Sequence, residues 1–187
     1  LSQLSPAAEK TLGALSVHSK PLDIKDLAMV AGLTTAECMT GLDQLHEFRL
    51  VRSAGFEISV GHELIRRTLY QSLAASRKAW LHLGLAKVLQ ASTTNPPPDE
   101  LAIHFHHAGA ADQARDFARE AAEQAETSGA IPEALRFLGI AREHTDDPEA
   151  EAAYLDLVGK FLPRCKPRWK ALRERHLASP ARKEHPT

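Results

Sequence analysis

The chain has 187 residues, enough for one domain or two small ones, and its 23 Lys and Arg against 24 Asp and Glu give a formal net charge of −1. This balance excludes a surface built throughout to bind nucleic acid or anionic lipid. Aromatic residues make up only 5% of the chain while alanine occurs 30 times, which disfavours an all-β fold and favours closely packed helices.

Residues 1–72 are predicted to form a winged-helix domain of three helices followed by a β-hairpin. Capping residues indicate where the three helices begin: Ser5 before Pro6, Asp23, and Thr34 or Thr35. Gly32 ends the second helix, and Glu37 completes an approximate capping box in the third. The buried stripe of the third helix is predicted to consist of Cys38, Leu42, Leu45 and Phe48. Two short alternating segments around Ala54 and Gly55 then predict the hairpin.

The remainder up to residue 162 is predicted to be helical, and residues 73–162 are assigned to a second, repeat-containing domain. Apolar residues at helical spacing predict helices at about 62–73, 76–90, 99–107, 112–127, 132–143 and 148–162. The segment TTNPPP at 93–98 separates the second of these helices from the third. The expected fold class is therefore mainly α, with one small hairpin.

An internal repeat lies in the second domain, where Gly109 and Gly129 are 20 residues apart. Each glycine is followed by an alanine five residues later and then by small or apolar residues at steps of four and three: Ala114, Ala118 and Ala121, and Ala134, Leu138 and Ala141. This pattern of helix, glycine turn and helix resembles the tetratricopeptide repeat and predicts an α-solenoid. A generic alanine-rich helical hairpin is the alternative interpretation.

The last part of the chain, residues 163–187, differs in composition from the rest. It contains eight Lys and Arg, two Asp and Glu, and four prolines. We expect a weakly ordered basic tail, while residues 1–162 carry a net charge of −7.

The cysteines and apolar runs bear on where the protein works. Cys38 and Cys165 cannot form a disulfide framework, so a reducing cytoplasm is expected. No apolar run approaches the roughly 20 residues that span a bilayer. The first residues also lack the pattern of a signal peptide, so no membrane partner is expected. Because the chain begins with Leu1 rather than Met, we expect a fragment of a longer protein.

The stretch FEISVGHELIRRTLYQSL at 56–73 lies where the predicted hairpin ends and the next helix begins. Four other stretches carry the same resemblance as this one: PLDIKDLAMVAGL, LDQLHEFRLV, ELAIHFHHAGA and ARDFAREAAEQA. With these motifs, about residues 5–160 resemble the regulatory half of STAND signalling ATPases. That family includes bacterial LuxR-type and maltose-regulon-type activators and kinase- or cyclase-fused ATPases. The resemblance implies a winged helix that restrains an ADP-bound ATPase module and repeats that sense a protein or small-molecule inducer.

The resemblance also implies a role for His62, which matches the histidine of a Met-His-Asp-like motif that here reads Gly61-His62-Glu63. His62 would approach the β-phosphate of ADP bound by the parent protein, and Glu63 and Arg66 would supply the surrounding polar contacts. An imidazole N–H can donate to a phosphate oxygen, and a helix N-terminus favours an anion. His62 could instead only cap the helix or pack beneath the hairpin.

The sequence contains no phosphate-binding loop of the form G-x-x-x-x-G-K-[ST]. We therefore expect that these residues are not an enzyme by themselves and hold no cofactor. Under the resemblance, ATP or ADP would bind to an ATPase module that precedes Leu1 in the parent chain.

A winged-helix DNA-binding transcriptional regulator with a helical sensor domain is the alternative function. The third predicted helix contains Glu37, Asp43 and Glu47 but neither Lys nor Arg. Because contacts with phosphates need positive charge, DNA binding through this helix is disfavoured.

A cluster of three histidines, His104, His106 and His107, is a candidate set of metal ligands. On a helix, His104 and His107 share a face whereas His106 lies on another. No Cys or carboxylate pair stands at a recognisable ligand spacing. We therefore expect these histidines to pack rather than to bind a metal.

Overall fold

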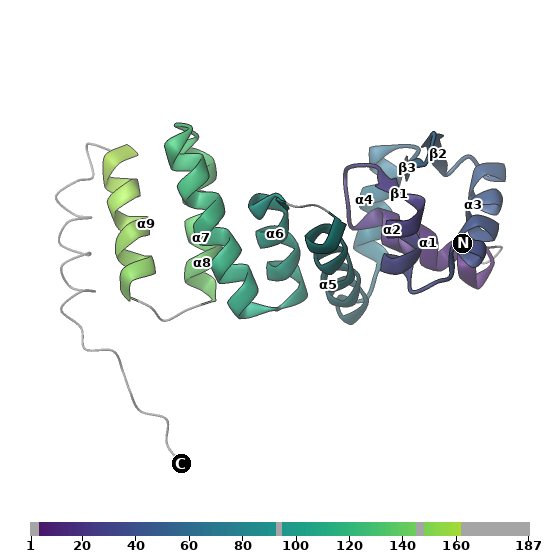
Figure 1. The fold of residues 1–187 in the computed structure, drawn as a ribbon, viewed down its shortest axis with the longest axis horizontal. Helices are drawn as coiled ribbons and strands as arrows, with labels where there is room; N and C mark the ends of the chain where they lie inside the picture. Colours follow the sequence, from purple (N-terminus) through teal and green to yellow (C-terminus); the bar gives the residue numbers. More distant parts are fainter. Residues whose placement is uncertain (1–3, 93–94, 145–147, 162–187) are drawn as a thin grey trace, which may run out of the picture. The chain divides into compact units, whose positions relative to one another are not determined.

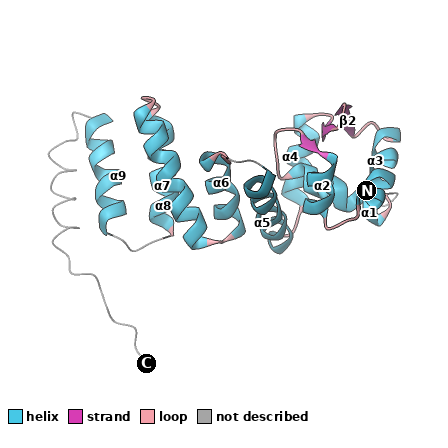
Figure 2. Cartoon of the chain, in the orientation of Figure 1, coloured by secondary structure: helices cyan, strands magenta, loops and turns pink. Residues whose placement is uncertain are grey.

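The computed structural model describes residues 4–92, 95–144 and 148–161. Within these ranges the chain is mainly helical, with a small antiparallel sheet of three strands near the N-terminus (Figures 1 and 2). The contacts between residues divide the chain into two units, Leu1–Pro96 and Pro97–Thr187.

The described residues of the first unit form five helices and the sheet. The elements are α1 (Pro6–Ser16), β1 (Leu22–Asp23), α2 (Ile24–Ala31), α3 (Thr35–Glu47), β2 (Val51–Ala54), β3 (Glu57–Val60), α4 (Glu63–Ser72) and α5 (Ala75–Ser92). The strand order is β1-β3-β2, with Val51 opposite Val60 in the hairpin and Leu22 opposite Ile58. The hairpin was predicted, whereas β1 was missed because a two-residue strand carries no alternating pattern.

The predicted helix starts are confirmed by their caps. The Ser5 hydroxyl accepts a hydrogen bond from the amide of Ala8, and Asp23 accepts one from the amide of Lys25. At α3, Thr34 and Glu37 form the complete capping box. These interactions satisfy amide groups that have no partner inside the helix, which is why short polar residues mark these three helix starts.

The buried core of the first unit consists mainly of aliphatic side chains from α1, α2, α3, α5 and the sheet, and α4 adds partly buried residues at its edge. Its most deeply buried members include Leu12, Leu27, Val30, Leu45, Leu81 and Leu85. Leu81 and Leu85 come from α5, a helix that the sequence analysis assigned to the second domain. In the structure α5 packs against α2 and contributes to the core of the first unit.

The predicted buried stripe of α3 is confirmed for three of its four members. Cys38, Leu42 and Leu45 are all at most 4% exposed, whereas Phe48 is 46% exposed. The prediction for Phe48 was wrong because α3 ends at Glu47. Phe48 follows the last helical residue, so the helical spacing no longer determines which way its side chain points.

The second unit is built from α6 (Pro98–Ala108), α7 (Ala111–Thr127), α8 (Ile131–Glu143) and α9 (Pro148–Phe161). Neighbouring helices in the chain pack on one another: α6 on α7, α7 on α8 and α8 on α9. The central cluster consists of small residues around one aromatic ring: Ala102, Ala118, Ala121, Ala122, Phe137 and Ala141. Gly109 and Gly129 end α6 and α7 with φ of 74° and 77°, a backbone conformation that favours glycine.

The residues of the 20-residue repeat lie at the contacts between these helices. Ala114, Ala118, Ala134 and Ala141 are fully buried, and Leu138 packs against the central cluster. Alanine at such positions lets helix axes approach closely.

The predicted tail at 163–187 and Cys165 lie outside the described residues. In the described ranges no helix has both the length and the apolar character needed to cross a bilayer.

Candidate functional site

His62 lies at the N-terminus of α4 as its capping residue, with φ of −150° and ψ of 135°. Its Nδ1 accepts a hydrogen bond of 3.1 Å from the amide of Leu64. A neutral imidazole that accepts through Nδ1 carries its proton on Nε2. The exposed His62 side chain therefore has an Nε2–H group that can donate, and no described residue accepts from it.

Glu63 and Arg66 pair with each other in the first turn of α4. The Nε and Nη2 groups of Arg66 donate to the two carboxylate oxygens of Glu63 over 2.7 and 2.8 Å. The remaining guanidinium nitrogen, Nη1, donates to the carbonyl oxygen of Ser16 at the end of α1 over 2.8 Å. The Arg66 guanidinium lowers the pKa of the Glu63 carboxyl, which keeps this pair ionised.

The structure thus brings the three predicted site residues to one helix end but gives them different partners. Arg66 joins α4 to α1 through Ser16, and Glu63 orients Arg66. His62 makes only the capping contact, so it is the member of the three with a ring nitrogen still available as a donor.

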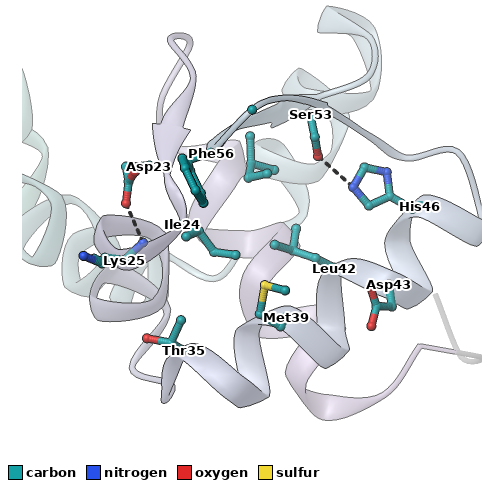
Figure 3. A pocket seen from close by; sticks show the side chains of 12 residues that line it. Asp23, Ile24, Lys25, Thr35, Met39, Leu42, Asp43, His46, Ser53 and Phe56 are labelled. Carbon is teal, nitrogen blue, oxygen red and sulfur yellow. Dashed lines mark hydrogen bonds between the residues drawn. The ribbon is translucent and has the colours of Figure 1, made fainter.

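A second feature, which the sequence analysis missed, is a hollow of about 610 Å³ on the first unit. We call it the α3–hairpin hollow. It is lined by Asp23, Ile24, Lys25, Thr35, Met39, Leu42, Asp43, His46, Ser53, Gly55, Phe56 and Ile58. Figure 3 shows Ile24, Met39, Leu42 and Phe56 gathered around it. Met39 and Phe56 were the available signals in the sequence, since both are large apolar residues outside the predicted buried stripes.

Polar side chains stand at the margin of the α3–hairpin hollow. At one end the Oγ of Ser53 and the Nε2 of His46 form a hydrogen bond of 2.8 Å, which joins β2 to α3 (Figure 3). At another the Asp23 carboxylate accepts from the Lys25 amide over 2.8 Å. Asp43, on α3, has no hydrogen-bond or ion-pair partner among the described residues.

One histidine of α6, His106, contacts the end of another helix of the second unit. His104 is 5% exposed, and the Nδ1 of His106 lies 2.8 Å from the Nε2 of His144 at the end of α8. The His107 ring lies 5.3 Å from that of His106, centroid to centroid. Among the described residues no three His, Cys, Asp or Glu side chains converge as a metal site would require. Of the three histidines, His104 is buried, His106 is half-buried and His107 is exposed.

The comparisons with known proteins place no constraint on the site. No family model matches the chain, and neither a curated protein nor a solved structure matches it. The resemblance to STAND ATPases therefore stays a prediction from the sequence motifs, and the geometry described above is the basis for a functional proposal.

Proposed function

We propose that the chain is a regulatory, non-catalytic segment of a STAND signal-transduction ATPase. Its first unit acts as a winged helix that docks on the ADP-bound ATPase module, and its second acts as tetratricopeptide-like repeats that receive a protein or small-molecule signal. The observation that carries this proposal is the outer face of α3, which is apolar and acidic next to the α3–hairpin hollow.

The face of α3 favours a protein partner over DNA. In helix-turn-helix proteins the corresponding helix reads the major groove, and binding depends on Lys and Arg that neutralise phosphates. Here α3 has three carboxylates and neither Lys nor Arg, and its Met39 is 48% exposed. A helix of this composition repels a polyanion but can bury apolar area against another protein.

The second unit supports the repeat interpretation through its glycine turns and alanine contacts. It also carries a groove of about 260 Å³ on α7, α8 and α9. Leu138 and Leu157 are apolar members of its lining, and Glu123, Glu126 and Asp156 are acidic ones. A groove of this kind is a suitable surface for a signalling partner, as the proposal requires.

His62 would link the first unit to the nucleotide. Its Nδ1 is occupied by the helix cap, so the exposed Nε2–H is the group that fits a β-phosphate oxygen of ADP. The ion pair with Arg66 partly neutralises the Glu63 carboxylate, so Glu63 repels a nearby phosphate less than an unpaired carboxylate would. Loss of the contact between His62 and phosphate would then accompany opening, so that the nucleotide biases a two-state hinge.

The test uses the full-length gene product that contains this chain. His62→Ala removes both the cap and the imidazole donor, whereas His62→Asp keeps a capping oxygen but places a carboxylate where the phosphate would lie. Both variants should weaken ADP retention and raise basal output, His62→Asp at least as strongly. Loss of one hydrogen bond to a charged group predicts roughly a 10- to 100-fold weaker retention of ADP.

Arg67→Ala is the matched control, because Arg67 is an exposed neighbour on the same helix. It should leave ADP retention and output unchanged. If His62 only caps α4, His62→Asp will behave like the wild-type protein. That result, or a gene product without a phosphate-binding loop, would contradict the proposal.

The DNA-binding alternative has one observation in its favour, since Arg49, just after α3, and Arg52, on β2, are both exposed. A gel-shift assay at low salt distinguishes the two functions. Tight, sequence-dependent binding of duplex DNA that is lost in an Arg49→Ala, Arg52→Ala double variant would favour the transcriptional regulator instead.

A further inference from the structure

We propose that the α3–hairpin hollow is a docking site for a protein segment that inserts one bulky apolar side chain and places a Lys or Arg beside Asp43. This inference rests on the proposed function, and it deepens that function by assigning the docking surface and the chemistry of the partner.

The apolar lining of the hollow is the first argument. Leu42 and Ile58 are each 4% exposed and belong to the core of the first unit. Above them, Phe56 is 76% exposed and Met39 48% exposed. Large apolar side chains that gather at one concave surface are typical of the buried centre of a protein interface.

The extent of this apolar surface indicates a protein segment as the occupant. The volume of about 610 Å³ would also accommodate a small molecule. However, Phe56 lies in the hairpin turn and keeps three quarters of its surface in water, so the apolar area continues past the hollow. A small molecule seated in the hollow would leave that area exposed, whereas a protein segment would cover both.

The Asp43 carboxylate at the margin indicates a basic residue in the partner, since the lysine that lines the hollow, Lys25, lies on α2 rather than on α3. Asp43 lies four residues after Met39, so the two share one face of α3. No described residue pairs with the Asp43 carboxylate. The nearby His46 is engaged with Ser53, and no Lys or Arg of α3 offsets the charge. A Lys or Arg of the partner would complement this carboxylate and orient the segment.

The walls of the hollow are held in place by bonds between its elements. His46 and Ser53 join α3 to β2. The amide of Ile24 donates to the carbonyl oxygen of Phe56 over 3.1 Å, which joins the hairpin turn to the start of α2. A surface that is already formed loses little conformational entropy on binding, which favours its use as a docking site.

The experiment selects binders to the full chain from a phage-displayed library of random 16-residue peptides and measures synthetic copies by fluorescence anisotropy. We expect the selected peptides to share a bulky apolar residue with a Lys or Arg within one helical turn of it. Phe56→Ser and Met39→Ser should each weaken their binding at least 10-fold. Asp43→Lys should weaken it similarly, and the Asp43→Lys chain should select peptides with Asp or Glu instead.

Met29→Ser is the matched control, because Met29 is 58% exposed on α2 but does not line the hollow. It should leave binding unchanged, and thermal melts monitored by circular dichroism must show that every variant is folded. The proposal is overturned if no peptide is selected, if the peptides tolerate Phe56→Ser and Met39→Ser, or if no basic residue is shared. It is also overturned if hexylammonium alone saturates the NMR shifts of these residues, since the hollow would then be a small-molecule site.

These outcomes are separable from those of the proposed function. A failed peptide selection with the expected His62→Asp effect removes only this docking site. Selected basic peptides combined with wild-type ADP retention in His62→Asp would remove the ATPase role while leaving the docking site in place.

Discussion

The two units of the chain build helical structure from different core side chains. The first uses large aliphatic residues such as Leu45 and Leu81, and it packs α1 against α3 and α4, which are not its neighbours in sequence. The second also buries large residues such as Leu101 and Phe105, but its central cluster is made of alanines around Phe137, and its contacts are mainly between helices that follow one another in the chain. A core of large residues can unite distant segments, whereas small residues favour close contacts between consecutive helices.

The same difference decides what each unit leaves on its surface. Joining three helices to a hairpin leaves the α3–hairpin hollow where α2, α3 and the hairpin meet. The helices of the second unit leave the smaller groove on α7, α8 and α9. The contrast between the units can be tested by substitutions whose effects should differ between them.

The largest effect is expected in the aliphatic core of the first unit. Leu45→Ala removes a side chain that is 0% exposed and should lower the free energy of unfolding by about 3 kcal/mol. Urea unfolding monitored by circular dichroism measures this loss, and hydrogen exchange shows whether it is confined to the first unit. Phe48→Ala, at a 46% exposed position, should cost under about 1 kcal/mol. Equal losses would show that the assignment of Phe48 to the surface is wrong.

An intermediate effect is expected when the same substitution is made once in each unit. At Gly41 of α3, a Cβ atom would lie 2.9 Å from the carbonyl carbon of Ala7, so Gly41→Ala should destabilise the protein by about 2 kcal/mol. At Gly139 of α8 nothing lies within 4 Å of a Cβ, so Gly139→Ala should stabilise it by about 0.5–1 kcal/mol. Thermal and urea unfolding of both variants check the signs, and a shared sign would refute the close contact of α1 with α3.

The smallest effect is expected when the pH is lowered, and it concerns the stability of the second unit. Burial and the neighbouring His106 lower the pKa of His144 in the folded protein. Below about pH 6.5 an unfolded histidine gains a proton, so the unfolded state binds more protons than the folded state. The free energy of unfolding therefore decreases as the pH is lowered. The second unit should therefore melt a few degrees lower at pH 5 than at pH 7. In His144→Asn this difference should shrink, as hydrogen exchange of its peptides can measure. An unchanged difference would count against His144 as the group responsible.

Much of the helical structure could be predicted from local signals. The six helices expected after the hairpin have bounds within two residues of those in the structure, and Ser5, Asp23 and Thr34 cap the first three helices. The alanine positions of the repeat are buried as expected. These features depend on neighbouring residues and on helical spacing, both of which are present in the sequence itself.

The candidate sites could be predicted only in part. The position of His62 at a helix start follows from its local sequence, but the bond from Arg66 to Ser16 joins residues 50 positions apart. The α3–hairpin hollow likewise needs residues from α2, α3 and both strands of the hairpin. No local sequence pattern indicates contacts between residues so far apart in the chain. The hollow could therefore be identified only from the folded structure.

The sequence by itself determined the mainly helical class, the capped helix starts and the alanine contacts of the second unit, because each depends on interactions within a few turns of chain. Only the tertiary structure decided that α5 belongs to the first core, that β1 completes the sheet and that Phe48 is exposed. These outcomes depend on which distant surfaces meet as apolar area is buried, and that competition is settled by the whole fold.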